Sequence, residues 1–173
     1  MFLSKQLFRR SFILAVFSLL FLLTGLAEDF SRPLLFVSMP EDAQIIEDVR
    51  FEDGDFIQTY QLGGGAHITL LRNANFDMSL TDLVASEWEG ATSVSSLNLE
   101  PISGHQTDAL RFNYTDADSV SFLVTLISVK SGNDTLIFEA VFPSRDGEEQ
   151  INAIVDKMIQ SMSVINMSES NLG

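Results

Sequence analysis

The chain has 173 residues and no cysteine, and 24 acidic residues against ten basic ones give it a formal net charge of −14. Proteins bind nucleic acid or an anionic lipid surface through clustered Lys and Arg, so this composition argues against polyanion partners and predicts no nucleic-acid binding. Without cysteine there is no disulfide, thiolate zinc site or cysteine nucleophile. An apolar fraction of 46%, with 14 Phe, is enough for one buried core.

Residues 1–27 have the pattern of an export signal. Lys5, Arg9 and Arg10 precede an uncharged apolar run, Phe12–Leu26, and the small residue Ala27 follows it. The run has 15 residues, short of the roughly 20 that span a membrane, so we predict cleavage after Ala27, with an uncleaved anchor as the alternative. The mature chain then has seven basic and 24 acidic residues, a formal charge of −17. We expect the general secretory pathway to deliver it to a bacterial periplasm or the medium, without stable membrane insertion after cleavage.

The rest of the chain predicts one domain, residues 28–165, and a polar tail, residues 166–173. Asp53-Gly54 between two β-rich runs predicts a hairpin, and Ser79 is placed to cap a helix. The predicted strands, in chain order, are 34–38, two runs within 45–62, then 66–71, 93–99, 109–115, 119–130 and 135–142. The predicted helices are 79–90 and 148–162.

The run 119–130 carries apolar residues at both odd and even positions, which is typical of a central strand covered on both faces. The loops 116–118 and 131–134 are too short for parallel crossovers, so the sheet should be antiparallel. The two predicted helices are the candidates to cover its faces. The sequence therefore predicts an α+β fold, an antiparallel sheet with helices packed on both faces.

The glycine triplet Gly63–Gly65 raises the question of a phosphate site. A phosphate cradle needs glycines that lead into a helix N-terminus, usually with a Lys close by. Here the glycines lead into a predicted strand, and the next basic residue is Arg72. We therefore predict a bend or bulge in which at least one of the three glycines has φ > 0.

Metal and catalytic residues are sparse. His67 and His105, with Asp108, are weak metal candidates, because zinc takes three or four side chains in fixed geometry and 38 positions separate the histidines. The acidic runs Glu52–Asp55 and Asp116–Asp118 lack the spacing of a calcium loop and suit hairpin turns. Neither Gly-x-Ser-x-Gly nor His-Glu-x-x-His occurs. We predict no cofactor, no defined metal site and no enzymatic activity.

Four runs, "LLFVSMP", "SLTDL", "ISGHQTDALRFNY" and "FEAVFPSRDGEEQINAIVDKMIQSM", together with the order of elements, resemble the PsbP/Mog1-like superfamily. The resemblance extends from about Leu34 to Val164 and implies an α/β/α sandwich. Members of that superfamily are mostly non-enzymatic binding or assembly factors, including photosystem accessory subunits, a small-GTPase-binding protein and bacterial envelope lipoproteins. Leu26 stands where a lipidated cysteine would be, and no functional residue of those members matches here.

Two functions follow as hypotheses. The first is an exported, non-catalytic protein-interaction or envelope accessory module with an unknown protein partner. The alternative is a small-ligand-binding protein or hydrolase that uses a pocket between sheet and helix, with His67 or His105 on its rim.

Overall fold

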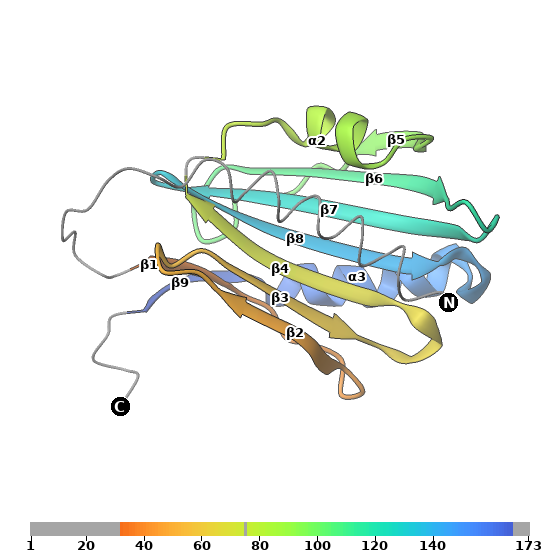
Figure 1. Cartoon of the computed structure of the whole chain (residues 1–173), viewed down its shortest axis with the longest axis horizontal. Coiled ribbons are helices and arrows are strands. Elements are labelled where there is room, and N and C mark those ends of the chain that lie inside the picture. Colours follow the sequence, from red (N-terminus) through yellow and green to blue (C-terminus); the bar gives the residue numbers. More distant parts are fainter. Residues whose placement is uncertain (1–31, 75, 168–173) are drawn as a thin grey trace.

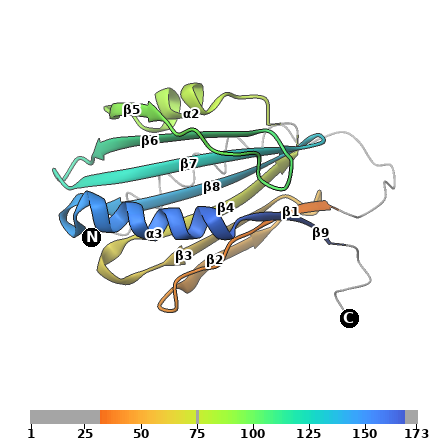
Figure 2. The same ribbon diagram turned by 180° about the vertical axis from the view of Figure 1, so that it is seen from behind.

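The structure, a computed structural model, describes residues 32–74 and 76–167. Most of it is antiparallel sheet: seven strands in the order β2-β3-β4-β8-β7-β6-β5, and a separate pair, β1 with β9 (Figure 1, Figure 2). The large sheet contains β2 (Gln44–Arg50), β3 (Phe56–Gln61), β4 (His67–Ala74), β5 (Thr92–Ser96), β6 (Thr107–Thr115), β7 (Ser121–Ser131) and β8 (Asp134–Pro143). The pair is β1 (Arg32–Phe36) and β9 (Ser163–Met167), and the α-helices of the described residues are α2 (Leu80–Glu87) and α3 (Glu148–Ser161).

The turns form where the sequence predicts them. At the β2–β3 hairpin the Phe51 N–H donates to the Asp55 carbonyl oxygen over 2.8 Å, and Gly54 has φ +83°. Between β3 and β4 the glycine triplet makes one 3₁₀ turn, in which Gly64 and Gly65 have φ of +73° and +89°. Only glycine adopts such values without strain. The predicted hairpin and the predicted positive φ are both confirmed, and all sheet pairings are antiparallel, as expected.

Strand β7 is buried on both sides, as predicted. Leu123 and Ile127 lie on the side of the sheet that α3 covers, which we call the α3 face, whereas Val124 and Leu126 lie on the opposite α2 face. Ser79 caps α2, because its hydroxyl oxygen accepts from the Asp82 N–H over 3.1 Å. The apolar residues that the helices bury against the sheet are Leu80 and Val84 from α2 and Ile151, Val155 and Met158 from α3. In the large sheet, however, the middle strand is β8 rather than β7.

The predicted fold class, an α+β fold with helices packed on both faces of the sheet as in an α/β/α sandwich, is wrong. The molecule is mostly antiparallel β-sheet, in two sheets, with α-helices of eight and 14 residues in the described chain. Seven strands at about 4.8 Å spacing make a sheet about 29 Å wide, whereas one helix is about 10 Å across. Each helix therefore covers only part of its face, and neither forms a layer: α2 packs on β6 and β7 at one side of the sheet (Figure 1).

The two-stranded pair, which we call the ribbon, was only half predicted. The sequence predicts β1, but it places the end of the folded chain after helix 148–162 and so misses β9. Register pairs run from Arg32 with Met167 to Phe36 with Ser163, so β9 includes the first two residues of the predicted tail. The predicted signal, residues 1–27, lies outside the described residues. None of the described helices is long and apolar enough to span a bilayer.

Candidate functional site

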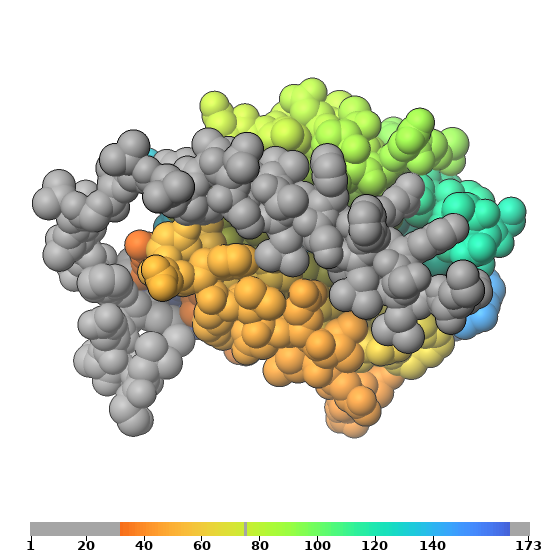
Figure 3. Space-filling view, viewed as in Figure 1, coloured from red at the N-terminus to blue at the C-terminus, as the bar shows by residue number. Residues whose placement is uncertain are grey.

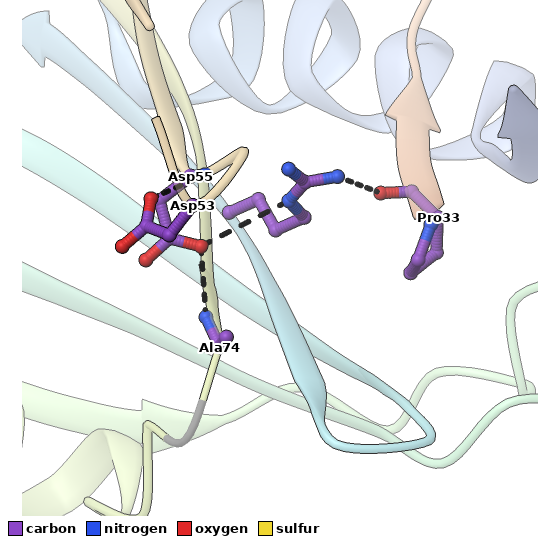
Figure 4. Close-up of polar contacts among 5 residues, drawn as sticks. Pro33, Asp53, Asp55 and Ala74 are labelled. Carbon is purple, nitrogen blue, oxygen red and sulfur yellow. Dashed lines mark hydrogen bonds and ion pairs between the residues drawn. The ribbon is translucent and has the colours of Figure 1, made fainter. Parts of the chain in front are cut away.

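A buried pair of opposite charges, Asp55 and Arg72, lies where the β2–β3 turn, β4 and the ribbon meet (Figure 4). Asp55 is the last residue of the turn, and Arg72 is on β4, on the α3 face. Their side chains are 6% and 4% exposed, and Arg72 Nε lies 4.0 Å from Asp55 Oδ1. The same Oδ1 accepts from the Ala74 N–H over 3.0 Å, while Arg72 Nη1 donates to the Pro33 carbonyl oxygen of β1 over 3.5 Å. The pair thus connects three segments of the chain.

The pair is incompletely satisfied. Within the described residues, Asp55 Oδ2 and Arg72 Nε make no hydrogen bond, although both atoms are buried. Burial raises the pKa of Asp55 to about 6, an effect that the Ala74 N–H opposes, the Asp53 carboxylate reinforces and the Arg72 charge opposes. Burial also lowers the pKa of Arg72 from its usual value, while the charge of Asp134 on β8 raises it. Burial therefore outweighs the Arg72 charge in its effect on the pKa of Asp55.

Gly54 is required for this packing. A Cβ on this residue would lie 2.6 Å from Arg72 Nη2 and 2.8 Å from Arg32 Nη1, closer than real Cβ contacts come. The turn can lie over the two guanidinium groups only because position 54 has no side chain and tolerates φ +83°. Arg72 also lies 5.7 Å from the centre of the Phe56 ring, and Arg50 lies at the same distance. The arginine is therefore held by aromatic contact as well as by charge.

The Asp55–Arg72 pair connects the β2–β3 turn, β4 and β1 to one another. Its carboxylate and guanidinium groups are both buried, and each faces groups of the same chain. From the sequence, Asp55 is interpreted only as part of an acidic turn, and Arg72 only as the first basic residue after the glycine triplet. The sequence therefore does not predict the pair. One signal was present: Arg72 continues the alternation of Ile68 and Leu70, both buried on the α3 face, and so occupies a core position of β4.

The weak metal candidates do not come together. His67, at the start of β4, pairs with Val141 of β8. Asp108, on β6, pairs with Ser128 of β7. Strands β8 and β7 therefore lie between the strands that carry His67 and Asp108. Three strand spacings are about 14 Å. His105 lies in the loop before β6, bridged to Ile102. No three His, Asp or Glu side chains of the described residues are grouped so that they could hold a metal ion.

Carboxylates of the two acidic runs, Glu52–Asp55 and Asp116–Asp118, accept hydrogen bonds from backbone N–H groups of their own hairpin turns. Asp116 Oδ1 accepts from the N–H groups of Asp118 and Val120, each over 2.9 Å, and Asp53 Oδ1 accepts from the Asp55 N–H over 3.0 Å. Carboxylates that accept local backbone N–H groups stabilise turns in this way.

A shallow hollow lies along α3, and all of its lining residues belong to that helix. It is lined by Glu148, Glu149, Asn152, Ala153 and Asp156. The lining side chains come from successive turns of a single helix, and three of them are acidic. The hollow is therefore not the pocket that the small-ligand hypothesis expects, and neither His67 nor His105 lines it.

No protein-family model matches this sequence, and no curated protein matches it. Among solved structures, PA94 of Pseudomonas aeruginosa, a protein of unknown function, is similar to this chain with a TM-score of 0.43 and 15% sequence identity. The match covers 65% of this chain and 92% of PA94. A similarity of this size says nothing about function.

Proposed function

We propose that this chain is an exported, non-catalytic protein-interaction module of the bacterial envelope. The N-terminal pattern of residues 1–27 supports the export. The observation that carries the interaction role is the edge of the large sheet at β2, which no other described strand pairs and which bears two exposed isoleucines.

Among the described strands, β2 lies at the end of the large sheet and pairs only with β3. Ile45 and Ile46 are 57% and 51% exposed on it, and the register shifts between Ile45 and Glu47. Figure 3 shows this strand, in orange, along one margin of the molecule. An edge strand offers unpaired backbone groups to an incoming strand, and exposed aliphatic side chains add apolar contact.

The charges beside this edge indicate the chemistry of the partner. Glu41 and Asp42 are exposed just before β2, and Asp48 is exposed on β2 with its Oδ1 3.3 Å from Arg50 Nε. A second copy of β2 pairing antiparallel around its middle residue would bring Glu47 against its counterpart, which like charges oppose. A partner segment with apolar and basic residues fits the edge better, since it meets the isoleucines and the carboxylates together.

Site-specific photo-crosslinking in cells tests this proposal. A photoreactive amino acid at Ile46 should yield an adduct of defined mass in the envelope fraction. The matched control places it at Val94, which is 47% exposed on β5, the opposite edge of the same sheet. An adduct at position 46 and none at position 94 supports the proposal. No adduct at 46, the same adducts at both positions, or a chain that stays in the cytoplasm would contradict it.

A further inference from the structure

The ribbon has two unlike sides. On its inner side, Leu35 and Val37 are buried in the core under α3. On its outer side, Phe36 is 51% exposed and Ile165 is 40% exposed, and Leu34, which pairs with Ile165, is half-buried. Alternate residues of a strand point to opposite sides, so Leu34 and Phe36 share the outer side with Ile165. Phe36 and Ile165 form an exposed apolar patch with the half-buried Leu34, which also packs against the core. We call these three residues the outer patch.

The outer patch has a fixed position on the domain. Arg72 Nη1 donates to the Pro33 carbonyl oxygen in β1, and Ser103 Oγ accepts from the Val164 N–H in β9 over 2.9 Å. Ser161 Oγ, at the end of α3, accepts from the Ser38 N–H over 2.9 Å. Three polar contacts and the buried inner side thus hold the ribbon against the rest of the molecule.

The two strands of the ribbon contain no acidic residue, although the chain as a whole is very acidic. No Asp or Glu occurs in residues 30–40 or in residues 157–167, although the whole chain has 24. Arg32 adds a positive charge at the start of β1. The ribbon itself therefore adds no charge repulsion at an anionic lipid surface.

The short stretch of sequence between the apolar run and β1 limits how far the ribbon can lie from a bilayer that holds the run. The apolar run Phe12–Leu26 ends six residues before Arg32. Six residues span at most about 20 Å. As long as the run is inserted in a membrane, the start of β1 stays within that reach of it. The tether also raises the effective concentration of the outer patch at the surface, so even a weak apolar contact is populated.

We propose that the outer patch, Leu34, Phe36 and Ile165, contacts the lipid surface to which the N-terminal apolar run tethers the chain before cleavage. Phe enters the headgroup region through its apolar ring, and aliphatic side chains add buried area there. The contact uses no cluster of basic residues, so it is compatible with the acidic composition. It rests on the export signal of the proposed function, and removal of that signal would release the domain.

The experiment uses the full chain in vesicles of phosphatidylcholine, with fluorophores attached to single cysteines. The chain has no cysteine of its own, so Phe36→Cys and Ile165→Cys report the outer patch without a further change. Matched controls are Val94→Cys and Val120→Cys, which replace apolar residues 47% and 41% exposed on other parts of the domain. A quencher carried on the lipid headgroups should quench the labels at 36 and 165 severalfold more than those at 94 and 120.

Equal quenching at all four positions would overturn the proposal. So would a label at 36 whose emission shifts with protein concentration but not with lipid, since that result assigns the outer patch to a second copy of the chain. Cell fractionation separates this inference from the proposed function. If the chain is not exported while the labels at 36 and 165 are still quenched in vesicles, only the proposed function fails; if it is exported without that quenching, only the lipid contact fails.

Discussion

Replacing Asp55 with Asn should change how stability depends on pH. The carboxyl group is buried beside Arg72, and burial raises its pKa from 3.8 to about 6 in the folded chain. The groups that face it are Arg72 on β4, Asp53 in the turn and Asp134 at the start of β8. Because the folded protein holds this proton more tightly than the unfolded chain, the stabilisation is fully present below the unfolded pKa and is lost as pH rises through about 6.

The size of the effect follows from the two pKa values. A difference between 3.8 and about 6 corresponds to about 3 kcal/mol over the whole pH range. Of this, about 1.4 kcal/mol falls between about pH 5 and about pH 8, by the same linkage. That window avoids acidities near the sequence pI of about 4.2, where solubility is lowest. Over it, the free energy of unfolding of Asp55→Asn should gain about 1.4 kcal/mol relative to wild type.

Urea unfolding at several pH values measures this difference. Trp88, the single tryptophan, packs edge-on against Phe112 and Tyr114 with ring centres 5.5 Å and 5.1 Å away, so its fluorescence reports the loss of the α2-side core. Asp118→Asn is the matched control, because it removes the same charge from an exposed turn. If the difference between Asp55→Asn and wild type is constant across the window, or if the control shows the same trend, the reasoning about the buried pair is refuted.

Two further predictions concern single side chains, both measured as urea midpoints. Gly54→Ala should destabilise the fold by more than Gly64→Ala. Both positions have positive φ, which costs a residue with a Cβ about 1–2 kcal/mol, but only at position 54 does the new Cβ meet two guanidinium groups. Equal losses of stability in the two variants would contradict the packing at Arg72. Phe138→Ala, at a fully buried site on β8, should cost about 3–5 kcal/mol. Phe122→Ala, at a partly buried site, should cost less, and the reverse order would mean that β8 is not the centre of the core.

Local patterns were enough to predict most strands and both helices. The Asp53-Gly54 turn, the Ser79 cap and the two-sided apolar run of β7 each depend on neighbours in the sequence, and the structure has all three. The fold class failed for a different reason. Two predicted helices suggest two helical layers. Whether a helix covers a face of the sheet, however, depends on the number of strands in that sheet, and no local pattern predicts this number.

The buried pair could not be predicted because it depends on register. Asp55 and Arg72 meet only when β3 and β4 align Phe56 with Arg72, and the Pro33 contact also needs β1 to lie beside the same strands. Strand β9 was missed for a similar reason. Its five residues, "SVINM", have no alternation strong enough to separate them from a tail, and their pairing partner lies at the other end of the chain.

The ribbon also sets an order of events when the chain folds during its synthesis. Arg32 pairs with Met167 and Phe36 with Ser163, so the first and last described strands complete each other. Synthesis from the N-terminus delivers β1 first and β9 last of the described strands. Closing so long a loop is slow and entropically costly, and it cannot begin until residue 163 has emerged. Leu35 of β1 and Val37 just after it, both buried in the folded domain, therefore remain without the partner strand β9 until the other described strands have been made.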